Sequence, residues 1–159
     1  MPTNFLRTPT RPDASATRGA VRAAGEARLM RLTAGRVVID VELADTASAA
    51  LLWAALPLRS AAEPWGETLH FELPVRMGRD RGARINGRLG DVYYWPEQRR
   101  IMVPFGATPI SRPGEIRLPQ PLNVVGRLLG QPEALRAVRT GEMVALERMT
   151  GREPGRPDR

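Results

Sequence analysis

Few side chains in this chain of 159 residues have the chemistry of a catalytic or metal-binding group. It has no cysteine, which excludes disulfides, thiolate catalysis and thiolate metal ligands. The one histidine, His70, leaves a transition-metal site dependent on carboxylates, so we predict neither a metal nor a cofactor. His70 itself is interpreted as a solvated strand residue, with a general base at a surface groove as the alternative.

Glu67 is the carboxylate whose position is most unusual. It falls in phase with Leu69, Phe71 and Leu73, which alternate with polar residues as in a half-buried strand. A carboxylate at the start of an inward-facing row either lies in water at the rim of the fold or is held by donors for a purpose. We keep both interpretations open.

The aromatic residues are concentrated between Gly87 and Ser111. Residues 92–95 and 100–105 are typical of the two strands of a hairpin, with residues 96–99 as its turn. An apolar floor with a few polar groups is typical of a ligand site, whereas simple core packing is the alternative. The candidate ligand-binding residues are Glu67, Tyr94, Trp95, Phe105, Thr108 and Pro109.

Residues 77–88 contain four arginines and three glycines, and we predict that they form a loop. Guanidinium groups there could bind a phosphate or a carboxylate, and a solvated loop is the alternative. A glycine-rich phosphate motif and a Gly-x-Ser-x-Gly nucleophile elbow are both absent from the sequence.

The net charge of +7 comes mostly from the two ends of the chain. Residues 1–26 and 148–159 carry eight arginines and four acids, whereas residues 27–147 carry sixteen arginines and thirteen acids. A polyanion-binding surface should be clustered on the folded part, so we expect no nucleic-acid partner. No apolar run approaches the roughly 18 residues of a membrane span, so we expect no membrane partner.

Composition divides the chain into a domain at residues 26–149 and two tails. Residues 1–25 and 150–159 are rich in Pro, Arg and Gly without periodicity, and we expect them to be disordered. An organelle transit peptide would need an amphipathic helix, against which Pro2, Pro9 and Pro12 argue. No apolar secretory core is present, and we expect a cytoplasmic location.

The rest of the domain is predicted to be mostly β. Residues 27–33 and 36–43 form an opening hairpin, and Asp45 is the expected N-cap of a helix that runs to Leu56. Because this helix has hardly any polar face, we expect it to be largely covered.

The C-terminal third is predicted to hold two strands and a helix. Pro119 and Pro121 restrict residues 116–122 to an edge or an irregular run, and residues 122–129 form a strand. Gly126 in that strand indicates a bulge or a close backbone approach. A short helix begins at Pro132, and residues 142–148 form the last strand.

Four blocks in order resemble the prokaryotic family of small cyclophilin-like domain proteins between residues 27 and 148. They are Trp65-Gly-Glu67, Gly90-Asp-Val-Tyr-Tyr-Trp-Pro96, Phe105-Gly-Ala-Thr-Pro109 with Ser111, and Asn123-Val-Val-Gly126. The resemblance implies a mainly β fold, a closed eight-stranded barrel with two short capping helices.

Its implications for function are limited by residues that are missing. Cyclophilin isomerases carry an arginine that binds the prolyl carbonyl, followed shortly by a Phe and a Gln and later by a histidine. Arg76 has no aromatic residue or glutamine nearby, and His70 precedes it. We therefore predict a binding module for a small molecule or a short peptide, with a divergent peptidyl-prolyl isomerase as the alternative. The sequence specifies neither the ligand nor the oligomeric state.

Overall fold

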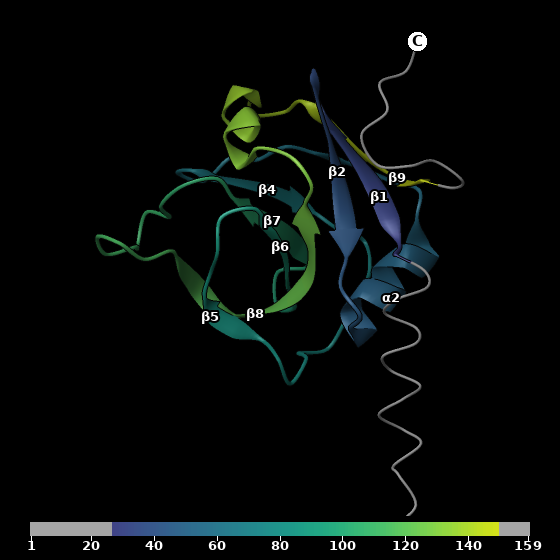
Figure 1. Cartoon of the computed structure of the whole chain (residues 1–159), viewed down its shortest axis with the longest axis horizontal. Coiled ribbons are helices and arrows are strands. Elements are labelled where there is room, and N and C mark those ends of the chain that lie inside the picture. The colour runs from purple at the N-terminus through teal and green to yellow at the C-terminus, as the bar shows by residue number, and fades with distance from the viewer. Residues whose placement is uncertain (1–26, 150–159) are drawn as a thin grey trace, which may run out of the picture.

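Nine antiparallel strands make up most of the computed structural model, which describes residues 27–149 (Figure 1). The strands are β1 (Leu29–Ala34), β2 (Val37–Leu43), β3 (Leu58–Ala61), β4 (Thr68–Glu72), β5 (Arg84–Asn86), β6 (Asp91–Trp95), β7 (Arg100–Pro104), β8 (Arg117–Leu128) and β9 (Met143–Met149). Helix α2 spans Ala47–Ala55, and the 3-10 helix η1 spans Pro132–Ala137. The mainly β class is confirmed, while the tails expected to be disordered lie outside the described residues.

The strands follow the order β3-β9-β1-β2-β8-β6-β7-β4, and β5 pairs separately with β8. The two predicted hairpins are confirmed, because β1 pairs with β2 and β6 pairs with β7. The sheet curls strongly, with β8 bending across it from the β1–β2 hairpin to β5 (Figure 1). Nine strands replace the eight expected, and β3 and β4 are the two ends of the order.

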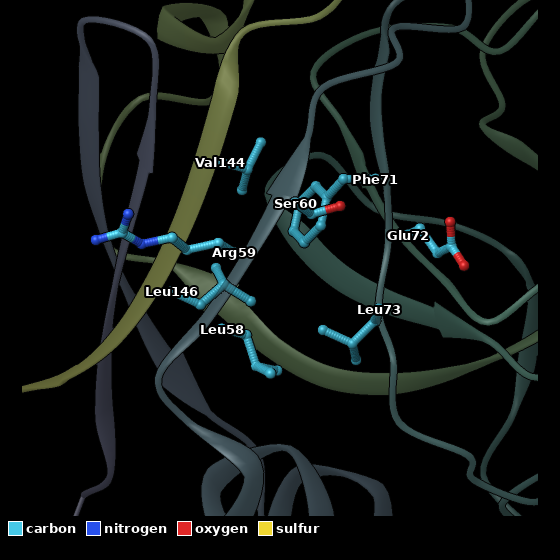
Figure 2. A pocket seen from close by; sticks show the side chains of 8 residues that line it. All are labelled: Leu58, Arg59, Ser60, Phe71, Glu72, Leu73, Val144 and Leu146. Atoms are coloured by element: carbon cyan, nitrogen blue, oxygen red, sulfur yellow. The ribbon is translucent and has the colours of Figure 1, made fainter.

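No hydrogen-bonded ladder joins β3 to β4 within residues 27–149, so a closed barrel is not confirmed. Side chains fill the seam between them, with Phe71 and Leu73 from one side and Val144 and Leu146 from the other, while Arg59 points away (Figure 2). The gap has no room for a water molecule. Beyond β3 the chain bonds to β4 instead, because the Glu63 amide donates to the His70 carbonyl at 2.7 Å and the Trp65 amide donates to the Thr68 carbonyl at 2.9 Å.

Both faces of the β4–β7–β6 region are covered. The larger core lies inside the curled sheet and includes Phe71, Tyr94 and Ile101. A second cluster on the opposite face consists of Tyr93, Met102, Leu118 and Leu122, with Trp65, Trp95 and Val124 packed against it. The alternation of apolar and polar residues predicts that this second face is exposed to solvent, but much of it is buried.

Helix α2 begins one residue later than expected, because its N-cap is Thr46 rather than Asp45. The Thr46 hydroxyl accepts a hydrogen bond from the Ala49 amide at 3.1 Å, which satisfies a donor in the first turn. The expectation that the helix is largely covered is wrong in part, since Leu51 is 47% exposed. Arg148 supports the other end by donating to the carbonyl of Trp53 at 2.7 Å.

Strand β8 runs through both prolines without a break. The β5–β8 register shifts between Arg84 and Asn86, which are paired with Leu122 and Arg117, so the prolines fall in the irregular stretch of the ladder. Gly126 does mark a close approach, because a Cβ there would lie 2.7 Å from the carbonyl oxygen of Glu42. Asn123 is fully buried and donates from Nδ2 to Ser48 Oγ at 2.8 Å, which fastens α2 to β8.

Candidate functional site

A pocket of about 390 Å³ opens on the face that carries the second cluster. This volume lies within the range of about 300–1,000 Å³ that is typical of small-molecule sites. We call it the tryptophan pocket, and its lining residues are Glu63, Pro64, Trp65, His70, Trp95, Gln98, Arg100 and Pro119. It combines apolar rings with one cation, one carboxylate, one imidazole and one amide.

The strand register brings the central residues together. Trp95 on β6 lies directly opposite Arg100 on β7, and His70 on β4 lies opposite Met102, two residues further along β7. Because side chains alternate between faces with a period of two, His70, Trp95 and Arg100 project from the same face of the sheet. The segment between β3 and β4 then supplies Glu63, Pro64 and Trp65 from one side.

Trp65 reaches the pocket through a tight turn. Gly66 has φ +58, and a Cβ there would lie 2.9 Å from Cδ of Pro109, so this position favours glycine on two grounds. The Trp65 ring then meets His70 edge-on, with 5.5 Å between the ring centroids and 74° between the planes. The Trp95 indole is fixed at its other edge, because its N–H donates to Oε1 of Gln120 at 2.8 Å.

His70 is 6% exposed, so the expectation that it is a solvated strand residue is wrong. Trp65 packs against the face of the sheet from which His70 projects. The alternation of residues within the strand cannot predict this cover, because Trp65 comes from outside the strand. The pKa of His70 is lowered from 6.5 to about 4, chiefly by burial and next by the Arg100 charge, while Glu63 opposes the change. The imidazole is neutral at pH 7, and its buried Nε2 has no hydrogen-bond partner among the described residues.

The charged groups of the pocket form an ion pair at its mouth. Arg100 Nη1 contacts Oε2 of Glu63, with the Arg100 side chain 28% exposed and that of Glu63 56% exposed. Arg100 is fixed within the sheet between Trp95 and Glu72, whereas Glu63 comes from a connecting segment outside the strands. The backbone of Arg100 is therefore held by strands on both sides, whereas Glu63 lies outside the strands.

Of the six residues expected to bind a ligand, Trp95 alone lines this pocket. Tyr94 faces the larger core and is fully buried, with its hydroxyl donating to the Val75 carbonyl at 2.6 Å. Burial raises the pKa of its phenol. Its role is core packing, which was the alternative interpretation for the aromatic cluster.

The other four lie together at a separate rim. Glu67 pairs with Arg136 of η1, with 3.4 Å between Nη2 and Oε2, and its carboxylate is 44% exposed. The Arg136 guanidinium also lies 5.4 Å from the centre of the buried Phe105 ring. Thr108 is buried and donates to the Arg117 carbonyl at 2.6 Å, whereas Pro109 is exposed. These contacts hold η1 and residues 105–111 in place.

Sequence reasoning missed Glu63, Pro64, Trp65, Gln98, Arg100 and Pro119 as pocket residues. They come from three separate stretches of chain, and the pairing of β6 with β7 makes Trp95 and Arg100 neighbours. The predicted hairpin could have identified Arg100, because a four-residue turn at residues 96–99 places residues 95 and 100 opposite each other.

The arginine-rich segment is not wholly a loop, because Arg84–Asn86 forms β5. Arg79 pairs with Glu97 and also donates to the Pro121 carbonyl at 3.0 Å, which ties the segment to the hairpin turn and to β8. Among residues 27–149 no three His, Asp or Glu side chains are grouped closely enough to hold a metal ion. In the same residues no helix has the length and apolarity that crossing a membrane requires.

Comparison with known proteins identifies the family of this chain. The family model described as cyclophilin-like matches residues 28–147. The chain belongs to the cyclophilin-like family. No curated protein sequence matches it, so the family assignment brings no activity with it.

Two solved structures share the cyclophilin-like architecture. The hypothetical protein AF2241 from Archaeoglobus fulgidus is 30% identical, with a TM-score of 0.68 over 79% of this chain and 99% of that chain. McbB, solved in complex with tryptophan, is 17% identical, with a TM-score of 0.57 over 80% of this chain and 46% of that chain. The likeness to McbB shows the fold alone, whereas AF2241 matches this chain over almost the whole of its own length.

Proposed function

We propose that this cyclophilin-like protein is a binding module whose ligand, a small molecule or a short peptide, enters the tryptophan pocket. The observation that carries the proposal is the convergence of Trp65, Trp95, His70 and Arg100 on one open space of about 390 Å³. Aromatic surfaces supply binding energy, and a few placed polar groups supply orientation, as in most ligand sites. Ligand binding at the rim of Glu67, Phe105, Thr108 and Pro109 stays a prediction with less support.

Ligand-induced thermal stabilisation tests the proposal. A panel of small aromatic acids, aromatic amines and short proline-containing peptides is screened for compounds that raise Tm, because binding to the folded state alone stabilises it. We expect at least one class to raise Tm in the native protein and in Arg59→Gln, a variant of an exposed arginine outside the pocket. The Tm of Trp95→Leu should not respond. A response that survives in Trp95→Leu would place the site elsewhere.

The divergent prolyl isomerase remains the second candidate, and one observation favours it. Isomerisation needs a surface that holds the twisted amide more tightly than the planar one, and Arg100 lies beside apolar rings that could receive a proline. Arg100 is already paired with Glu63, however, and Arg76 is exposed outside the pocket.

A standard proline-peptide assay decides between the two candidates. Uncatalysed isomerisation takes about 10–100 s, so even weak catalysis is visible. We expect turnover to be absent or marginal. Robust turnover that disappears in Arg100→Gln and persists in Arg59→Gln would replace the binding module with the enzyme.

A further inference from the structure

The charge at the mouth of the tryptophan pocket indicates what kind of ligand it takes. Arg100 is 28% exposed and is fixed by strand pairing on both sides, to Glu72 of β4 and to Trp95 of β6. Its partner Glu63 is 56% exposed and lies on a connecting segment. An ion pair this exposed contributes little to stability, because water screens both members.

A ligand carboxylate can therefore take the place of Glu63. The guanidinium fork matches a planar carboxylate in two parallel hydrogen bonds, which a single contact with Glu63 does not use fully. The pocket thus favours an anion at its mouth.

The interior of the pocket contains no second charge. His70 is 6% exposed, its Nε2 is buried, and its imidazole is neutral at pH 7, so it adds no charge. Apart from the Gln98 amide, the remaining surfaces are the rings of Trp65, Trp95, Pro64 and Pro119. Stacking and edge-to-face packing on indoles favour a flat aromatic body.

We propose that the tryptophan pocket binds a small aromatic carboxylate, with its carboxylate on Arg100 in place of Glu63 and its ring against Trp65 and Trp95. This inference rests on the proposed function and narrows its ligand class. It assigns Arg100 as the residue that selects for charge and the two tryptophans as the residues that select for shape.

Calorimetric titration with naphthoate, and with its neutral isostere naphthamide, tests the assignment. We expect naphthoate to bind the native protein at least tenfold more tightly than naphthamide. In Arg100→Gln the affinity for naphthoate should fall at least tenfold and that for naphthamide should stay within twofold. Glu63→Gln should bind naphthoate more tightly, because the competing carboxylate is gone, and Arg59→Gln should match the native protein.

Two sets of results would overturn the assignment. Equal affinity for naphthoate and naphthamide, or naphthoate binding that survives in Arg100→Gln, shows that Arg100 does not select for charge. Naphthoate binding that survives in Trp65→Leu and Trp95→Leu shows an adventitious anion site on another arginine. If naphthoate fails to bind while another class from the Tm panel depends on Trp95, the inference is wrong and the proposed function stands; if no class depends on Trp95, both are wrong.

Discussion

The imidazole of His70 is neutral because the protein around it disfavours the charged form. Burial is the larger cause, and the Arg100 guanidinium adds repulsion that Glu63 only partly offsets. A neutral imidazole places no second positive charge beside Arg100. The charged groups of the pocket at pH 7 are therefore Arg100 and its partner Glu63, next to two indoles.

The low pKa of His70 makes stability depend on pH in a defined window. Between pH 6.5 and about 4 the unfolded chain binds a proton at His70 that the folded protein does not, so stability should fall as the pH falls. At about 1.4 kcal/mol per pKa unit, the full effect is about 3 kcal/mol. Denaturant unfolding of the native protein and of His70→Asn, at about pH 7 and about pH 4.5, measures it.

The comparison uses the change with pH within each protein, so any cost of the substitution itself cancels. We expect His70→Asn to lose less stability on acidification than the native protein. An equal loss in both proteins would show that His70 titrates normally and is not buried as described.

At the scale of elements, the close approach of β2 and β8 requires a glycine at position 126. A Cβ at Gly126 would lie 2.7 Å from the Glu42 carbonyl oxygen and 2.9 Å from Cγ1 of Val41. Gly126→Ala should destabilise the protein by about 1–3 kcal/mol, since crowding a packed site costs that much. Gly78→Ala is the matched control, because nothing lies within 4 Å of a Cβ there. Similar losses in denaturant unfolding for both variants would refute the close approach.

Alternation and turn residues predicted most of these elements. Strands were predicted at residues 36–43, 92–95 and 100–105 because their periodicity reflects a buried face, and the structure has strands at Val37–Leu43, Asp91–Trp95 and Arg100–Pro104. Gly126 was identified because a glycine within a strand indicates a bulge or a close approach. The burial of His70 could not be predicted, because the residues that cover it arrive from other parts of the chain. Thr46 displaced Asp45 as the N-cap because two adjacent residues of similar capping preference leave the choice to tertiary contacts, here the hydrogen bond from Thr46 to the Val124 carbonyl.

At the scale of the molecule, the curled sheet has one narrow seam, between β3 and β4, which side chains fill. Residues 28–147 match the family model, so the fold should not need the rest of the chain. Residues 26–149 alone should unfold cooperatively, with a free energy of unfolding within about 0.5 kcal/mol of the full chain. Thermal and denaturant unfolding followed by far-UV circular dichroism measures both. Failure of the shorter chain to fold would show that residues outside this range belong to the core.

The candidate site was only partly predicted, and the molecule's topology explains why. The aromatic hairpin pointed to Trp95, but the order β6-β7-β4 is what brings β4, β6, β7 and the segment before β4 to one face. Tyr94, adjacent to Trp95 in sequence, faces the opposite side as strand geometry requires. Tyr94 thus packs in the core, whereas its neighbour Trp95 lines the pocket.

The three tryptophans provide the most direct measurement of the central claim, that the tryptophan pocket is the ligand site. Trp65 and Trp95 line the pocket, whereas Trp53 lies on α2 beneath the guanidinium of Arg148, 5.1 Å from its ring centre. Each indole N–H gives its own signal in a nitrogen–proton NMR spectrum. During titration with the compound that most raises Tm, the account predicts saturable shifts of the Trp65 and Trp95 signals while the Trp53 signal stays in place. Saturable binding that moves Trp53 alone, or leaves Trp65 and Trp95 unmoved, would contradict it.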